Sequence, residues 1–251
     1  MQRIWTIGMV LVVVCALGAA AATAASAATE GPFFGSESKR LLVGETRAVK
    51  VKSVAKEYLL VGEVLGIKWT TTCKALKLNS GAGLLGSIGA NAGKGDEILE
   101  YGECSVTGNG TGCKVKGSAI TTNLIKSELA YSTKERAGPI LTIFTPASGS
   151  VFVTVHYEGS CTFSEGEITG SAAAEVADST GKVSEVNKEG ALEMTGELIS
   201  TGAKSTKYWS EAGGVLTEHT AELKDFGSAD TLAGTSVVEL GSGQKWGVRT
   251  H

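Results

Sequence analysis

The chain of 251 residues contains serine, histidine and aspartate, the residue types that nucleophilic hydrolysis requires. Ser87, either His156 or His219, and Asp225 supply the residue types of a hydrolytic triad, in which histidine accepts the proton of the serine hydroxyl. Residues 85–89 (LGSIG) differ from the nucleophile elbow, because leucine replaces its first glycine. The chain is rich in serine, so such a set arises by chance. We therefore predict no catalytic residues and rank a secreted hydrolase as a distant third function.

A glycine-rich segment offers a second chemical reading, which is phosphate binding. Residues 81–86 (GAGLLG) match the dinucleotide fingerprint, whose third glycine opens a helix that holds the pyrophosphate. The following residues 87–95 (SIGANAGKG) contain three more glycines and no helix-forming face. The sequence therefore predicts a glycine-rich loop or irregular strand here, and no cofactor.

Carboxylates are the third set, and glutamate outnumbers aspartate by 22 to 4. Glu165 with Glu167, or Glu97 with Glu100, would provide the two carboxyl groups of a glycoside hydrolase. Solvent-facing strand and turn positions explain these residues equally well, and the distance between two carboxylates is not readable from sequence. The four aspartates never form the D-x-D run of a calcium loop, so no metal site is predicted.

The N-terminus has the features of an export signal. Arg3 precedes an uncharged stretch that reaches Ala28, the apolar run from Ile7 to Leu17 suits the hydrophobic region, and residues 25–27 (ASA) form a small-x-small cleavage site. The alternative is an uncleaved membrane anchor, since about 25 uncharged residues are long enough to span a bilayer. The second half of the stretch is mostly alanine, so we favour a cleaved signal peptide over residues 1–27, without membrane insertion after cleavage.

Removal of the signal leaves four cysteines, an even number in an exported chain. Cys73, Cys104, Cys113 and Cys161 therefore predict two disulfides, for which three connectivities exist. A two-residue turn at 108–109 would place Cys104 opposite Cys113 in a hairpin, so the sequence favours that pair and, by elimination, Cys73 with Cys161. A zinc site with four thiolates is the alternative, but the eight residues between Cys104 and Cys113 exceed the usual ligand spacing.

Period-2 alternation dominates the rest of the chain, and no segment has a convincing helical stripe. Glycine, at 34 residues, and other turn formers separate the short runs, which is typical of a sandwich or barrel. We therefore predict an all-β fold, an antiparallel β-sandwich or barrel stapled by disulfides. The predicted strands are 49–54, 58–61, 66–73, 120–122, 124–131, 140–144, 150–157, 167–176, 191–201, 215–223 and 235–240.

The predicted organisation is a single domain behind two N-terminal segments. Residues 28–40 are polar and glycine-rich and are expected to form a flexible leader after the signal peptide. Residues 41–251 form the antiparallel β domain. The polar stretch 178–188 is the candidate sub-boundary between an earlier and a later sheet.

The charge distribution limits the classes of partner. The chain has 23 Lys plus Arg against 26 Asp plus Glu, with no basic stripe along the sequence. The electrostatic attraction that drives nucleic-acid binding is therefore missing, and we expect no nucleic-acid partner.

Two regions carry a resemblance to other proteins. Residues 104–131, with two cysteines followed by 117–124 (GSAITTNL) and 129–131 (LAY), and the tail around 213–215 (GGV) and 243–248 (GQKWGV), resemble exported proteins of high-GC Gram-positive bacteria that have no assigned function. The resemblance covers about half of the mature chain and implies no activity.

The sequence thus favours a non-enzymatic protein that is secreted or held at the cell surface or envelope. Its predicted role is that of a structural or interaction module; the sequence does not identify the partner, and an envelope protein and a small ligand are the two candidates. The alternative is a β-barrel or sandwich that binds a small ligand, which would require an apolar cavity with a few convergent polar groups.

Overall fold

The computed structural model describes residues 32–36, 39–40, 47–53, 57–79, 84–85, 94–177, 196–243 and 246–249. Most of these residues lie in β-strands and none lies in an α-helix; a single 3-10 turn, η2, covers Lys116–Ser118. The predicted all-β fold is therefore confirmed. The predicted signal peptide and the stretch 178–188 lie outside the described residues.

The strands form one large antiparallel sheet and two small ones. The large sheet contains β3 (Arg47–Ser53), β4 (Tyr58–Val64), β5 (Ile67–Cys73), β7 (Leu84–Leu85), β8 (Lys94–Glu97), β10 (Ser105–Thr107), β11 (Lys114–Val115), β13 (Ile125–Tyr131), β14 (Ile140–Pro146), β15 (Val151–Glu158), β16 (Glu165–Gly170), β17 (Ala172–Ala177), β18 (Gly196–Thr201), β19 (Thr206–Ala212), β20 (Val215–Ala221), β21 (Leu223–Asp225) and β22 (Ser228–Leu240). The small sheets contain β1 (Phe33–Ser36), β2 (Lys39–Arg40) and β23 (Trp246–Arg249), and β6 (Ala75–Leu78), β9 (Leu99–Gly102) and β12 (Ala119–Thr121).

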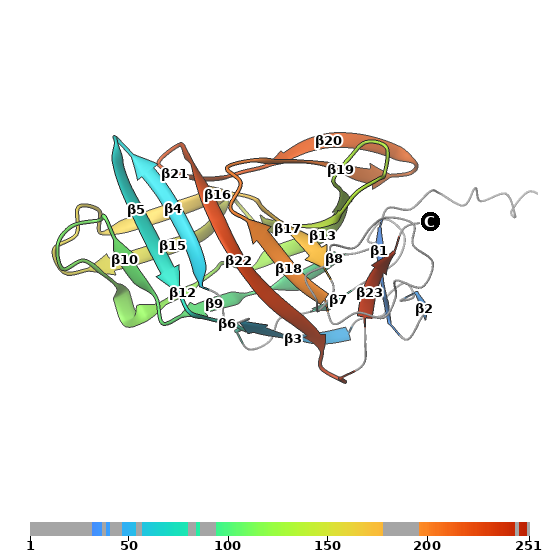
Figure 1. The fold of residues 1–251 in the computed structure, drawn as a ribbon, viewed down its shortest axis with the longest axis horizontal. Helices are drawn as coiled ribbons and strands as arrows, with labels where there is room; N and C mark the ends of the chain where they lie inside the picture. Colours follow the sequence, from blue (N-terminus) through green and yellow to red (C-terminus); the bar gives the residue numbers. More distant parts are fainter. Residues whose placement is uncertain are drawn as a thin grey trace, which may run out of the picture.

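The long strand β22 crosses the middle of the molecule and belongs to two runs of paired strands (Figure 1). Its first half pairs with β21 on one edge and with β4 on the other, and this run continues as β10-β5-β4-β22-β21-β16-β15-β11. β10 and β11 form the two ends of this run and lie beside each other, so the run is a nearly closed, barrel-like sheet. The second half of β22 pairs with β18 and β3, and that run continues through β17, β14, β13 and β8.

The small sheet β12-β9-β6 covers the interior of the large sheet. Leu76, Leu99 and Ile120 come from its three strands and are buried in the main apolar core. They pack in one cluster with large side chains of the barrel-like run, including Trp69 and Phe152. Each strand of this small sheet therefore contributes a buried side chain to the interior, which places the core between the two sheets.

The four predicted disulfide cysteines form two bonds, but the predicted pairing is wrong. The structure joins Cys73 to Cys104, with an S–S distance of 2.05 Å, and Cys113 to Cys161, with an S–S distance of 2.08 Å. The registers explain this result. β10 pairs with β5, Ser105 lying opposite Thr72, so the preceding residue faces Cys73. β11 pairs with β15 instead, which carries Cys113 toward the loop that follows β15.

The predicted hairpin turn at 108–109 is also wrong, because Asn109 is used elsewhere. Its side chain is buried, donating from Nδ2 to the Phe163 carbonyl at 3.0 Å and accepting from the Phe163 amide at 2.9 Å. Its own carbonyl accepts from the Thr162 amide. These bonds hold the segment between β10 and β11 against the loop after β15, so β10 and β11 do not pair with each other as a hairpin.

Two short N-terminal strands lie within the stretch 28–40, for which a flexible leader is predicted. Phe33–Ser36 pairs with β23 and with β2, so these strands belong to a three-stranded sheet with the end of the chain (Figure 1). Two buried residues of β23 explain the attachment: Trp246 and Val248 join Leu240 and Val238 in a second apolar cluster. The Trp246 ring also donates from Nε1 to the Val238 carbonyl at 2.7 Å.

The β19–β20 hairpin lies over the second run (Figure 1). It is held there by an ion pair whose carboxylate is buried. The Glu211 side chain is 1% exposed and accepts hydrogen bonds from Arg136, which lies in the β13–β14 connection. Tyr131 hydrogen-bonds to the same carboxylate and pairs in register with Trp209. The hairpin therefore has one polar anchor to the body of the sheet.

Candidate functional site

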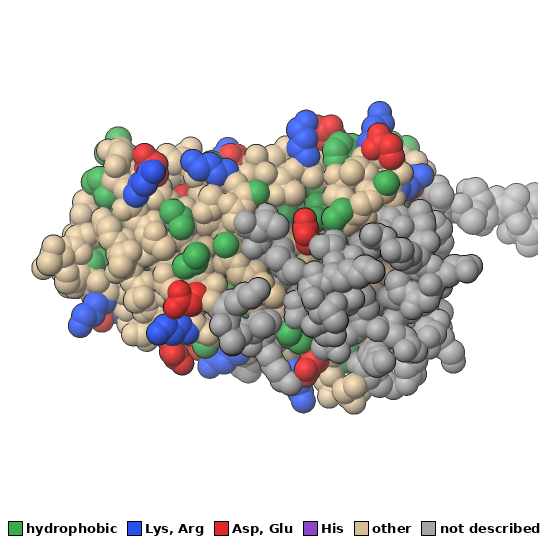
Figure 2. All heavy atoms as spheres, in the orientation of Figure 1, with side chains coloured by type: hydrophobic (Ala, Val, Ile, Leu, Met, Phe, Trp, Pro, Cys, Tyr) green, Lys and Arg blue, Asp and Glu red, His purple; other side chains and the backbone are tan. Residues whose placement is uncertain are grey.

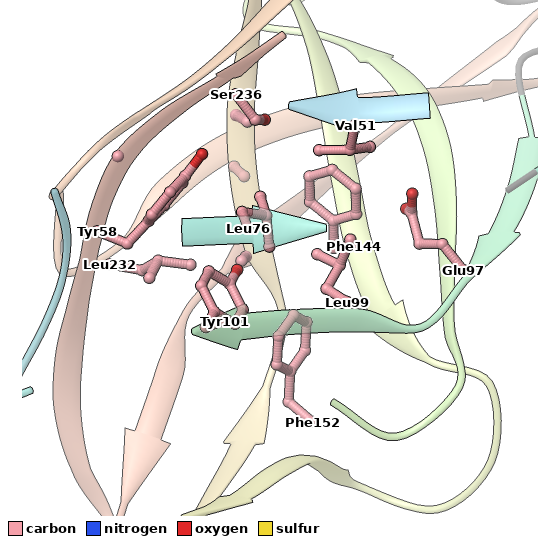
Figure 3. Close-up of a pocket in the computed structure, with 14 residues that line it drawn as sticks. Val51, Tyr58, Leu76, Glu97, Leu99, Tyr101, Phe144, Phe152, Leu232 and Ser236 are labelled. Carbon is pink, nitrogen blue, oxygen red and sulfur yellow. The ribbon is translucent and has the colours of Figure 1, made fainter. Parts of the chain in front are cut away.

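An apolar cavity of about 50 Å³ lies between the small sheet and β22. The small sheet contributes Leu76, Leu99 and Tyr101, while Tyr58 and Leu232 face them from β4 and β22 (Figure 3). The remaining lining residues are Val51, Glu97, Phe144, Phe152, Ala172, Ala173, Ala174, Gly234 and Ser236. The cavity is thus part of the interior of the fold and is lined mostly by apolar atoms.

Alternation along β22 places its lining residues on one face. Leu232, Gly234 and Ser236 are two residues apart and therefore point the same way from the strand. Gly234 leaves room for the ring of Tyr58, whose hydroxyl donates to the Thr235 carbonyl at 2.8 Å. Burial raises the pKa of the Tyr58 phenol to about 12. Tyr58 is therefore a fixed, neutral wall of the cavity.

We expect Gly234→Ala to destabilise the protein, because a Cβ at this position would lie 2.3 Å from Tyr58 Cδ1. The aromatic ring would have to move and release its hydrogen bond, an overpacking cost of about 1 to 3 kcal/mol. Urea unfolding measures the loss of unfolding free energy. Gly102→Ala is the matched control, since its Cβ would meet Ala75 at an ordinary 3.5 Å. Equal stability of the two variants would contradict the packing described here.

A second apolar cavity of about 40 Å³ adjoins the first. Tyr58, Tyr101, Phe152 and Leu232 line both cavities, so these four side chains form the boundary between the two lobes. The second lobe extends toward Thr71, Cys73, Ile120, Val153, Ile168, Leu223 and Leu60. The interior space is therefore two-lobed, and the Cys73–Cys104 disulfide forms part of its wall.

Glu97 is the ionisable group of the first lobe with an unsatisfied atom. Its carboxylate lies at one end of the cavity, beside Phe144 and across from Tyr58 and Leu232 (Figure 3). Ser127 hydrogen-bonds to the carboxylate, but Oε1 is buried without a hydrogen-bond partner among the described residues. Burial raises the pKa of Glu97 to about 7, opposed by the Ser127 hydrogen bond and assisted by the charge of Asp96.

The carboxylates of Asp225 and Asp230 form a second buried acidic group, at another place in the interior. Each residue is 1% exposed, and Asp225 Oδ1 and both oxygens of Asp230 are buried without a hydrogen-bond partner within the described part of the chain. Two glycines make space for these carboxylates. A Cβ on Gly166 would lie 2.8 Å from Asp225 Oδ2, and one on Gly62 would lie 2.8 Å from Asp230 Oδ1.

Electrostatics at this pair favours the protonated forms. Burial raises the pKa of Asp225 to about 6, against a hydrogen bond from the Phe226 backbone. Burial also raises the pKa of Asp230 to about 7; the charge of Asp225 adds to the rise and that of Lys204 opposes it. Above these values, two like charges would face each other in an apolar interior, which is costly.

The structure does not bring together the residues of the weighed hydrolytic triad. His156 is exposed, and its Nδ1 lies 3.4 Å from Glu165 Oε2, whereas Asp225 is buried. His219 lies on the β19–β20 hairpin, where its Nε2 is 2.9 Å from Ser210 Oγ and its ring stacks on Tyr208. Ser87 lies outside the described residues. The exposed Ser210–His219 contact sits on a projecting hairpin and lines neither lobe of the cavity.

Of the four glutamates named in pairs from the sequence, one lines the cavity and three do not. Glu97 lines the cavity, whereas Glu100 pairs with Lys77 at 3.0 Å. Glu165 is exposed beside His156, and Glu167 is exposed as well. Of the glycine-rich segment 81–86, the structure describes Leu84–Leu85, which form a strand paired with β3.

Sequence reasoning did not single out Tyr58, Tyr101 or Leu232 as members of a site. Their only signal was membership of short apolar or aromatic runs, which core residues share. Glu97 carried a better signal, since a glutamate in a strand beside Ile98 and Leu99 has a buried neighbour. That signal indicates burial and does not reveal which side chains surround the carboxylate.

Within the residues described, no helix has the length and hydrophobicity of a membrane span, and no three His, Cys, Asp or Glu side chains gather where a metal ion could be held. Figure 2 shows charged side chains of both signs scattered over the visible face. Family models, curated proteins and solved structures were each compared with the chain, and none of them matches it.

Proposed function

We propose that the protein is an exported, non-enzymatic β protein that binds a small, largely apolar ligand in its two-lobed cavity. The observation that carries this proposal is Glu97 Oε1, a buried acceptor without a partner among the described residues, on the wall of an otherwise apolar space. A buried polar atom without a hydrogen bond costs about 1 to 3 kcal/mol. A ligand with a hydrogen-bond donor removes that cost, which makes Glu97 the polar anchor.

The volumes limit the ligand's size. The lobes measure about 50 Å³ and about 40 Å³, while an apolar cavity that admits benzene has about 150 Å³. The proposed ligand is therefore a short aliphatic amine or alcohol of a few heavy atoms. With so few atoms, we expect dissociation constants of about 0.1 to 10 mM.

The charge of Glu97 sets the preferred head group. An ammonium group donates to the ionised carboxylate, so amine affinity should rise with pH through about 7, where Glu97 loses its proton, and then level off. Below that pH the gain is about tenfold per pH unit, since one proton is released on binding. A carboxylic acid of the same length should bind weakly above pH 7, because two like charges would meet.

The test is a titration with butylamine, 1-butanol and butyrate, which share a chain and differ in head group. Chemical shifts of the methyl groups that line the cavity report binding by NMR. We expect affinities in the order amine, alcohol, acid at pH 8, and a loss of amine preference of at least tenfold in Glu97→Gln. The control Glu100→Gln removes a carboxylate that pairs with Lys77, and it should bind like the wild type. Lack of binding by all three compounds would overturn the proposal.

Export is the second part of the proposal. The N-terminal signal features and the two disulfides support a secreted protein or one at the cell surface or envelope, because disulfides persist in oxidising compartments. N-terminal sequencing of the protein recovered from the producing cells' medium or envelope tests this part. We expect a mature chain that starts at Ala28.

One observation favours the other candidate function, an interaction module for an envelope protein. Leu65 and Phe226 are 93% and 57% exposed, and each occupies a hairpin tip with a positive φ, of 52° and 47°. β4 and β22 pair side by side, so the two tips lie at the same end of the barrel-like sheet, and Phe163 contacts the Phe226 ring. These tips lie outside the cavity lining, so the ligand titration separates the two functions.

A further inference from the structure

The wall of the barrel-like sheet is interrupted along one edge of β22. On this edge, residues 228–230 pair with β21 and residues 233–238 pair with β18, while β4 and β3 occupy the opposite edge. Thr231 and Leu232 lie between the two ladders. The amide of Gly202, from the β18–β19 connection, bonds to the Leu232 carbonyl at 3.0 Å and bridges the interval.

An opening of about 20 Å³ lies at this interruption. Much of its wall consists of small side chains, including those of Ser171, Ala203 and Ala221. A space of this size holds about one water molecule. The opening is therefore narrow. Because the side chains around it are small, they fill little of the gap between the strands.

Leu232 connects this opening to the interior, because its side chain lines the opening and both lobes of the cavity. Ala172 lines the opening and the first lobe, and Leu223 lines the opening and the second lobe. Residues on the wall of the opening are thus also the wall of the cavity. Rotation of one leucine side chain would join the spaces, and such rotations are fast compared with ligand exchange.

Charge along this route suits a ligand with a donor group. Asp230 lines the opening, is 1% exposed and has two carboxylate oxygens without a hydrogen-bond partner in the described residues. Lys204 is exposed at the rim, and Glu222, also on the wall, pairs with Lys224 at 2.7 Å. An amine that passes the rim would meet the Asp230 carboxylate before it reaches Glu97.

We propose that the interruption between β21 and β18 is the portal by which ligand enters and leaves the cavity, with Leu232 as its gate. This inference rests on the proposed function, since it assigns a route to the same cavity. An obstruction at the portal raises the barrier for entry and exit alike. It therefore slows both rates and leaves the dissociation constant nearly unchanged.

The experiment places a bulky group at the rim, outside the two lobes. Ala203→Trp should slow association and dissociation of butylamine at least tenfold, with a dissociation constant within twofold of the wild type, as measured by NMR line-shape analysis at pH 8. Ala212→Trp is the matched control, an exposed alanine at the far end of β19. Leu232→Ala should have the opposite effect and speed the exchange of butylamine.

A second variant separates obstruction from misfolding. Ala203→Cys is labelled with N-phenylmaleimide after the protein has folded, and Ala212→Cys is labelled as its control. Butylamine should exchange slowly in both Ala203→Trp and labelled Ala203→Cys. If butylamine still binds to both proteins and its exchange rates are unchanged, the portal is overturned and the proposed function stands. Absence of butylamine binding in the wild type would overturn both.

Discussion

Loss of the Cys113–Cys161 disulfide should lower the free energy of unfolding by about 4 kcal/mol, since the bond closes a loop across a sequence separation of 48 residues. For a chain of this length each kcal/mol shifts the melting temperature by about 2 to 4 °C. The double variant Cys113→Ser/Cys161→Ser should therefore melt roughly 8 to 16 °C below the wild type. Calorimetry under non-reducing conditions measures this shift.

The matched variant Cys73→Ser/Cys104→Ser should lose slightly less, because its sequence separation is 31 residues. It should also perturb ligand binding, since Cys73 lines the second lobe of the cavity. Mass spectrometry of non-reduced peptides checks the pairing itself. A peptide that links Cys104 to Cys113, or a melting temperature that reduction does not change, would contradict the structure.

The acidic pair should make the protein less stable as the pH rises. The folded-state pKa values of about 6 for Asp225 and about 7 for Asp230 exceed the ordinary aspartate value of about 3.9. Between these limits, the folded state holds protons that the unfolded state has released. The free energy of unfolding therefore falls from about pH 4 to about pH 7, at up to about 1.4 kcal/mol per pH unit and group.

Asp230→Asn removes one of these carboxylates and should stabilise the protein at pH 8, where the wild type carries the buried charge. We expect a gain of about 1 to 3 kcal/mol at pH 8 and little change at pH 4. Urea unfolding at both pH values gives the two free energies. Glu167→Gln, an exposed position on β16, should leave the pH dependence unchanged. An Asp230→Asn curve parallel to that of the wild type would argue against the buried pair.

Ligand binding and stability should have opposite pH dependence. The proposed amine binds best above pH 7, where Glu97 is ionised, and this is the range in which the acidic pair weakens the fold. Because a ligand stabilises the state it binds, saturation with butylamine should raise the melting temperature more at pH 8 than at pH 5. Above pH 7, ionised Glu97 thus strengthens amine binding, while the ionised acidic pair lowers the stability of the fold.

Alternation of side chains was sufficient to predict most of the longer strands, although Thr206–Ala212 and most of the short strands were missed. Tyr58–Val64, Ile67–Cys73, Ile125–Tyr131 and Val151–Glu158 lie close to the predicted runs, because strand periodicity is a local property. The 167–176 run is divided at Ser171 into two strands, and the 235–240 run is the second half of a longer one. The first half of β22 alternates poorly, since Gly234 replaces a large side chain to make room for Tyr58.

The sequence by itself determined an all-β fold, because strand alternation is a local property of the chain. It also determined the number of disulfides, because four thiols in an oxidising compartment form two bonds. Tertiary structure alone decided which cysteines meet, since β10 pairs with β5 and not with its neighbour in the chain. It also decided the cavity. Tyr58, Glu97, Tyr101 and Leu232 come from four strands of two sheets, and no spacing in the sequence encodes the distances between them.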